Sequence, residues 1–80
     1  MKIKLSRHSK NNIRLYEITV AEIEECISNP LNSGTEGECL IAYKVFTGRF
    51  NNLPLKVVYV TEQRTYFIIT AYPLRKSYWR

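Results

Sequence analysis

Residues 55–72, LKVVYVTEQRTYFIITAY, decide the fold class of this 80-residue chain. They contain two runs rich in β-branched and aromatic residues, Leu55–Val60 and Thr65–Tyr72, joined by a polar segment. Such runs favour strands, and a short polar connection favours an antiparallel hairpin, so we predict a hairpin with its tip at Glu62-Gln63. By alternation, one face of the second strand carries Tyr66, Ile68, Thr70 and Tyr72, and the other carries Phe67, Ile69 and Ala71.

Upstream of the hairpin the pattern predicts one more strand and, before it, two helices. Cys39–Phe46 is a mostly apolar run of strand length, and Asn32–Gly37 has the composition of a turn-rich loop. Thr19–Glu22 has the form of a capping box, which begins a helix that Asn29-Pro30 ends. Ser6–Tyr16 has weaker helical spacing. We therefore predict one α+β domain, residues 1–80, with two N-terminal helices packed on a three- to four-stranded antiparallel sheet.

Charge is segregated along the chain, which has a net charge of +5. Residues 1–16 contain five Lys or Arg and no acid, residues 17–38 contain six Glu and no Lys or Arg, and the remainder is basic again. This segregation predicts a basic face and an acidic face. Clustered cations are typical of proteins that bind a polyanion, with nucleic acid first among the candidates. A solubilising surface charge explains the same pattern equally well.

The residue content disfavours several other functions. No segment approaches the ~20 apolar residues of a membrane span, and Met1–Lys10 lacks the apolar centre of a signal peptide. The chain has two Cys, one His and no Asp, so we expect no disulfide framework, no metal site and no cofactor. We interpret Cys26 and Cys39 as buried small apolar residues in a reducing cytoplasm.

The side chains that remain for chemistry are His8, several Arg and Lys, and the hydroxyls of Thr and Tyr. This set suffices for cleavage of RNA by its own 2′-hydroxyl, which needs no metal. That reaction needs a base, an acid for the leaving oxygen and cations for the phosphorane charge. Histidine titrates near neutrality and serves as either base or acid.

The order of motifs resembles a known family. It runs from His8 through YEITVAEI at 16–23 and Asn29-Pro30 to Gly48-Arg49, and then to LKVVYV at 55–60 and FIITAYP at 67–73. Over nearly the whole chain this resembles small bacterial proteins long labelled a domain of unknown function and related to BrnT-like and RelE/ParE-type toxins. The ITAYP ending is also similar to RNase toxin domains of contact-dependent inhibition systems.

The resemblance implies a RelE/barnase-like fold, metal-independent endoribonuclease activity of the toxin type and an acidic antitoxin as partner. It implies His8 as acid or base and Thr70 and Tyr72 as residues that orient the phosphate. Arg49, or a tail cation such as Arg75, is the expected source of positive charge. A capping or packing role in the helix also explains His8, and strand propensity also explains Thr70 and Tyr72. The Lys-rich helix of typical RelE toxins and the Arg-Ser-Phe-Gly segment of BrnT do not occur, so their catalytic arrangement does not transfer.

Candidate RNA-binding residues are cations and rings that can contact phosphates and stack on bases. They are Arg14, Lys44, Arg75, Lys76, Tyr78 and Trp79. Packing of Trp79 on the sheet explains the aromatic tail as well. The alternative function is a non-catalytic module on the same fold that binds RNA or a protein. An inactive phage-derived accessory protein also fits the sequence.

Overall fold

The computed structural model describes residues 1–75 and confirms the α+β class. In these residues two helices and a five-stranded sheet are present. In chain order the elements are β1 (Lys2–Leu5), α1 (Arg7–Tyr16), α2 (Val20–Ser28), β2 (Asn32–Glu36), β3 (Cys39–Val45), the 3-10 helix η1 (Phe50–Asn52), β4 (Pro54–Glu62) and β5 (Thr65–Pro73). Within the described residues neither helix is long and apolar enough to cross a membrane.

The sheet is larger than the sequence predicted, and it is mixed. Its strand order is β1-β5-β4-β3-β2; β1 runs parallel to β5 and the other neighbours are antiparallel. The prediction of three to four antiparallel strands was therefore wrong in number and in direction. The two strands that it missed lie at the two edges. β1 is only four residues long. β2 has the sequence NSGTE, which favours turns, and it forms a strand only because it pairs with β3 beside it.

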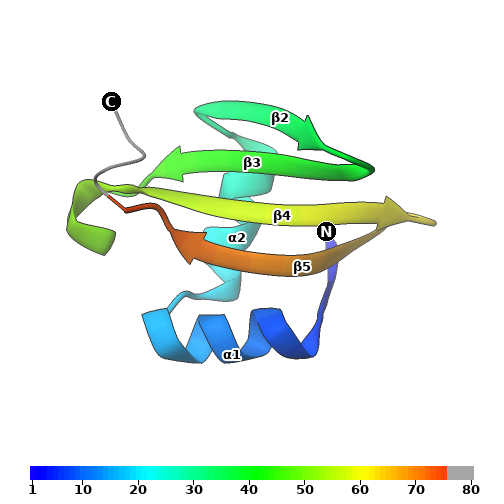
Figure 1. Ribbon diagram of the computed structural model, residues 1–80, viewed down its shortest axis with the longest axis horizontal. Helices are drawn as coiled ribbons and strands as arrows, with labels where there is room; N and C mark the ends of the chain where they lie inside the picture. Colours follow the sequence, from blue (N-terminus) through cyan, green and yellow to red (C-terminus); the bar gives the residue numbers. More distant parts are fainter. Residues whose placement is uncertain (76–80) are drawn as a thin grey trace.

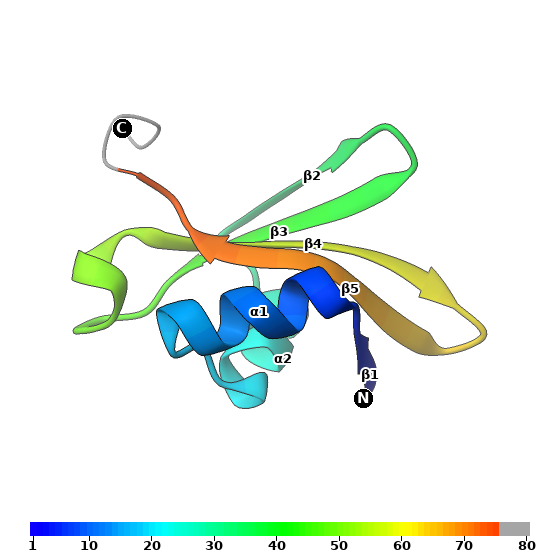
Figure 2. The same ribbon diagram turned by 60° about the horizontal axis from the view of Figure 1, so that its bottom comes forward.

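Both helices lie on the same side of the sheet, as Figures 1 and 2 show. Helix α2 crosses the sheet, whereas α1 runs alongside β5 (Figure 1). On the opposite side, which we call the open face, the described residues place no helix (Figure 2). The domain therefore has one packed face and one face available for other contacts.

The core lies between the helices and the packed face of the sheet. Ile23 and Cys26 of α2 and Leu55, Val57 and Ile68 of the sheet are fully buried. Burial of these apolar side chains is the main source of stability in a domain of this size. The interpretation of Cys26 as a buried apolar residue is confirmed, whereas Cys39 is only half-buried.

The helix ends follow the predicted signals closely. Glu22 N–H donates to Thr19 Oγ1 at 3.1 Å and Thr19 N–H donates to Glu22 Oε1 at 2.9 Å, which completes the predicted capping box. Ser6 caps α1: its Oγ accepts from Ser9 N–H at 3.0 Å and donates to the carbonyl of Ile69 at 2.8 Å. The cap of α1 is thereby also an attachment to β5.

A β-bulge interrupts β5 and changes which side chains share a face. The pairing of β4 with β5 skips Ile69, so the alternation shifts by one residue there. Ile68 and Ala71 are both fully buried in the core, although strict alternation had placed them on opposite faces. The predicted grouping of Ile68 with Thr70 and Tyr72 was therefore wrong. The bulge moves Thr70 and Tyr72 off the packed face.

Candidate functional site

Two of the predicted catalytic residues, Thr70 and Tyr72, lie beside α1, the helix that also carries His8. His8 is exposed in the first turn of α1, and Asn12 and Tyr16 follow it at intervals of one turn on the same side of the helix. Asn12 Nδ2 donates to Thr70 Oγ1 at 3.1 Å, and Tyr16 lines the same pocket as Tyr72. We call Asn12, Tyr16, Thr70 and Tyr72 the α1–β5 seam. His8 lies about one turn before Asn12, roughly 6 Å away along the helix axis.

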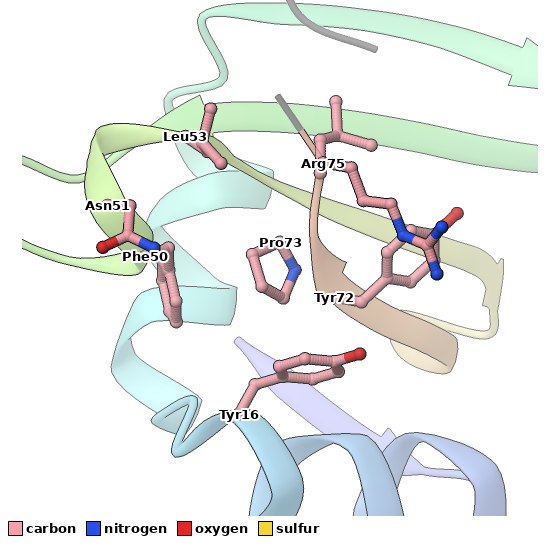
Figure 3. Close-up of a pocket in the computed structure, with 8 residues that line it drawn as sticks. Tyr16, Phe50, Asn51, Leu53, Tyr72, Pro73 and Arg75 are labelled. Atoms are coloured by element: carbon pink, nitrogen blue, oxygen red, sulfur yellow. The ribbon is translucent and has the colours of Figure 1, made fainter. Parts of the chain in front are cut away.

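A pocket of about 710 Å³ opens at the far end of this seam (Figure 3). Three aromatic rings, those of Tyr16, Phe50 and Tyr72, reach it from α1, η1 and β5, respectively. The Asn51 amide and the Arg75 guanidinium supply polar groups. The full lining is Tyr16, Phe50, Asn51, Leu53, Tyr72, Pro73, Leu74 and Arg75. We call this cavity the aromatic pocket.

The wall formed by η1 has an unusual backbone. Phe50, Asn51 and Asn52 have φ values of 53°, 55° and 60°, in the left-handed region that non-glycine residues seldom occupy. The loop is held by a hydrogen bond from Gly48 N–H to Asn52 Oδ1 at 2.8 Å and by the edge-to-face contact of Phe50 with Phe46. Such backbone strain is concentrated at binding sites in proteins, which supports a functional role for this wall.

Arg49 supports the pocket from behind. Its Nε and Nη2 donate to the two carboxylate oxygens of Glu22 at 2.7 and 2.9 Å, and Nη2 also donates to the carbonyl of Glu17. The hydrogen bond from Arg49 is the main reason that the pKa of Glu22 is lowered. The guanidinium also lies over the Phe50 ring, 4.6 Å from its centroid. Its charge is therefore compensated by Glu22, and the predicted supply of free positive charge by Arg49 has no support in this geometry.

The predicted RNA-binding residues are dispersed. Arg75 lines the aromatic pocket, and Arg14 is exposed in the last turn of α1, where a cation stabilises the helix dipole. Lys44 Nζ donates to the carbonyl of Asn29 at 2.9 Å and lies 3.5 Å from a Glu25 carboxylate oxygen. Lys44 therefore binds groups at the C-terminal end of α2. Lys76, Tyr78 and Trp79 lie outside the described residues.

The basic N-terminal segment forms two neighbouring elements, β1 and α1. Its cations, Lys2, Lys4, Arg7, Lys10 and Arg14, are all exposed. On α2, by contrast, Glu22 and Glu25 are paired with Arg49 and Lys44. The acidic helix is thus partly neutralised by the protein itself, while the β1–α1 side keeps its positive charge. In residues 1–75 no three His, Cys, Asp or Glu side chains form a group that could hold a metal ion.

Most of the aromatic pocket was not predicted from the sequence. Tyr16, Phe50, Asn51 and Leu53 line it, yet no spacing relates them to Tyr72 and Arg75. The only local signal was the Gly48–Pro54 segment, whose Asn51-Asn52 pair is typical of a turn with left-handed backbone.

Comparison with known proteins does not assign a family. The chain matches no protein-family model, and neither a curated protein nor a solved structure is significantly similar to it. The resemblance to BrnT-like and RelE-type toxins therefore stays a prediction.

Proposed function

We propose that this domain binds single-stranded RNA and holds an unpaired base in the aromatic pocket. The observation that carries the proposal is the set of three rings from three separate elements around a pocket of about 710 Å³. Stacking of a base on an aromatic ring contributes about 1–3 kcal/mol. The amide of Asn51 can hydrogen-bond the edge of a base, and the guanidinium of Arg75 can bind a phosphate.

The charge distribution favours a nucleic acid over an uncharged ligand. The exposed cations of β1 and α1 lie in a segment of 16 residues that contains no acid, and the whole chain has a net charge of +5. Such a surface attracts the phosphate backbone and releases counterions when the complex forms, so binding should weaken as the salt concentration rises.

Fluorescence anisotropy with a labelled ten-nucleotide RNA tests the proposal. Replacing Tyr16 with Ala should weaken binding by about 5- to 150-fold, the equivalent of 1–3 kcal/mol of stacking. Leu15→Ala is the matched control, because Leu15 is the neighbouring residue of α1, is 70% exposed and does not line the pocket. Equal affinities for a folded Tyr16→Ala variant and the wild type would refute the proposal.

The second candidate function is cleavage of the bound RNA, as in an endoribonuclease of the toxin type with a RelE/barnase-like fold. The hydrogen bond from Asn12 to Thr70 favours it, because it fixes the helix of His8 against β5. In this scheme His8 acts as acid or base on the 2′-hydroxyl or the leaving oxygen, and Thr70 and Tyr72 orient the phosphate. Arg75 supplies positive charge in place of Arg49. An acidic antitoxin that covers the β1–α1 side completes the proposal.

Incubation with labelled RNA in EDTA separates cleavage from binding. Wild-type protein should produce 2′,3′-cyclic phosphate ends, and His8→Ala should lose cleavage while its anisotropy titration stays unchanged. Cleavage that persists in His8→Ala would remove His8 from the reaction. Binding without cleavage by the wild type would leave the domain as a binding module.

A further inference from the structure

A second pocket lies towards the other end of β5, where β1 joins the sheet. It has a volume of about 460 Å³. Its lining is Lys2, Lys4, Val60, Glu62, Gln63, Thr65 and Phe67. Phe67 is 39% exposed, so its ring is accessible to a ligand. Two lysines flank this ring, so we call the site the lysine–phenylalanine pocket.

The strand register places this pocket on the open face. Lys2 pairs with Thr65 and Lys4 pairs with Phe67, so these side chains share a face. The alternating residues Ile3 and Leu5 pack against the core. Lys2, Lys4 and Phe67 therefore point away from the core and towards the open face.

Tyr72 lies on the same face, further along β5. It pairs with Lys56, whose Nζ lies 5.6 Å from the centroid of the Tyr72 ring, and the neighbouring pair of Val57 and Ala71 is buried in the core. Phe67 and Tyr72 lie opposite Val60 and Lys56, which are four residues apart on β4, so about 13 Å of strand separates them. That length corresponds to about four stacked nucleotides of one strand. The open face of β5 thus has an aromatic side chain near each end, exposed at Phe67 and half-buried at Tyr72.

We infer that the bound RNA continues from the aromatic pocket along the open face of β5 to the lysine–phenylalanine pocket. There Phe67 stacks on a second base, and the ammonium groups of Lys2 and Lys4 bind phosphates that follow one another along the strand. The lysines lie two residues apart on one face, about 6.6 Å, so they contact separate phosphates. This inference rests on the proposed RNA binding. It adds the path that the RNA follows on the protein and the minimum length of RNA that occupies both pockets.

Salt-dependent titration of the ten-nucleotide RNA tests the role of the lysines. Replacing both Lys2 and Lys4 with Gln should reduce the slope of log affinity against log salt by about 1.4, since each phosphate contact with a single strand contributes about 0.7. Arg64→Gln is the matched control for Lys4→Gln, because it removes one charge from an exposed position in the β4–β5 turn that lines neither pocket. An equal change of slope in Arg64→Gln and Lys4→Gln would overturn the inference.

Oligonucleotide length tests the role of Phe67 and keeps the two proposals separate. Phe67→Leu retains apolar bulk but removes the ring, so it should weaken binding of the ten-nucleotide RNA by about 5- to 150-fold and leave a trinucleotide unaffected. Tyr16→Ala should weaken both. Loss with Tyr16→Ala and none with Phe67→Leu would overturn the extended path while the aromatic pocket stands. No loss with either variant would overturn the proposed RNA binding itself.

Discussion

At the scale of single residues, Glu22 joins two parts of the molecule. Its carboxylate accepts from the N–H of Thr19 in the capping box and from two nitrogens of Arg49. Through Arg49 it also fixes the position of Phe50, since the guanidinium lies over that ring. One side chain thus begins α2 and anchors a wall of the aromatic pocket.

This arrangement predicts a specific acid sensitivity. Because the pKa of Glu22 is lowered from the usual 4.5, mainly by the Arg49 hydrogen bond, its contribution is complete above pH 4.5 and is lost as the pH falls through the lower, folded-state pKa. Glu22→Gln should reduce the free energy of unfolding by about 1–3 kcal/mol at pH 7. The difference from the wild type should shrink below pH 4.5. Urea denaturation of both proteins at several pH values measures this difference in the free energy of unfolding.

Glu62→Gln provides the control, because this substitution removes the same charge from an exposed position at the end of β4. It should change stability by less than about 0.5 kcal/mol at either pH. A constant difference between Glu22→Gln and the wild type from pH 7 to pH 3 would show that the lowered pKa of Glu22 does not contribute to stability.

At the scale of elements, the attachment of α1 to β5 creates the seam. Ser6 binds the Ile69 carbonyl and Asn12 binds the Thr70 hydroxyl, so both contacts involve the strand at or beside the bulge. β1 pairs with β5 only as far as Ile68, and α1 lies beside the strand beyond that point (Figure 1). The helix thereby covers an edge that would otherwise expose unpaired backbone groups.

Asn12 and its neighbour Asn11 offer a matched test of this attachment. Asn12→Ala should destabilise the fold by about 0.5–1.5 kcal/mol, because it removes a partly buried hydrogen bond to Thr70. Asn11→Ala, at an exposed position, should change stability by less than about 0.5 kcal/mol. Thermal and urea unfolding of the two variants measure the difference. Similar losses would indicate that helix propensity, and not the contact with β5, accounts for the effect.

The local parts of the fold could be predicted from sequence, and the long-range parts could not. The capping box and the stop at Asn29-Pro30 depend on neighbouring residues, and both are confirmed. The bulge at Ile69 depends on how β4 packs beside β5, which no local pattern encodes. The hairpin tip lies at Gln63-Arg64, one residue later than predicted, because both residues adopt left-handed φ values, 49° and 66°, as a two-residue turn of type I′ requires.

The same distinction applies to the candidate site. The sequence singled out Thr70 and Tyr72, and the structure gives each a neighbour on α1. It did not identify Tyr16 or Phe50, because the aromatic pocket is assembled from three segments that are far apart in the chain. Arg49 was selected as a free cation because its partner, Glu22, lies 27 residues away in the chain.

At the scale of the whole molecule, the fold divides its surfaces between stability and binding. The helices cover one face of the sheet (Figure 2). The strand register places Tyr72 and Phe67, with their neighbouring lysines, on the open face. β1 and α1, which carry exposed cations, both contact the same strand, β5. A single polyanionic strand can therefore contact rings and cations together without any change in the packed core.

The most direct test of this account is a two-dimensional ¹H–¹⁵N NMR titration of the protein with the ten-nucleotide RNA. We predict that the largest shift changes occur at the backbone amides of Tyr16, Phe50 and Tyr72, followed by those of Lys4 and Phe67. The amides of α2 and β2 should change little, because those elements contribute to neither pocket. Changes centred on α2 or β2, or none at saturating RNA, would contradict the claim that RNA binds along β5.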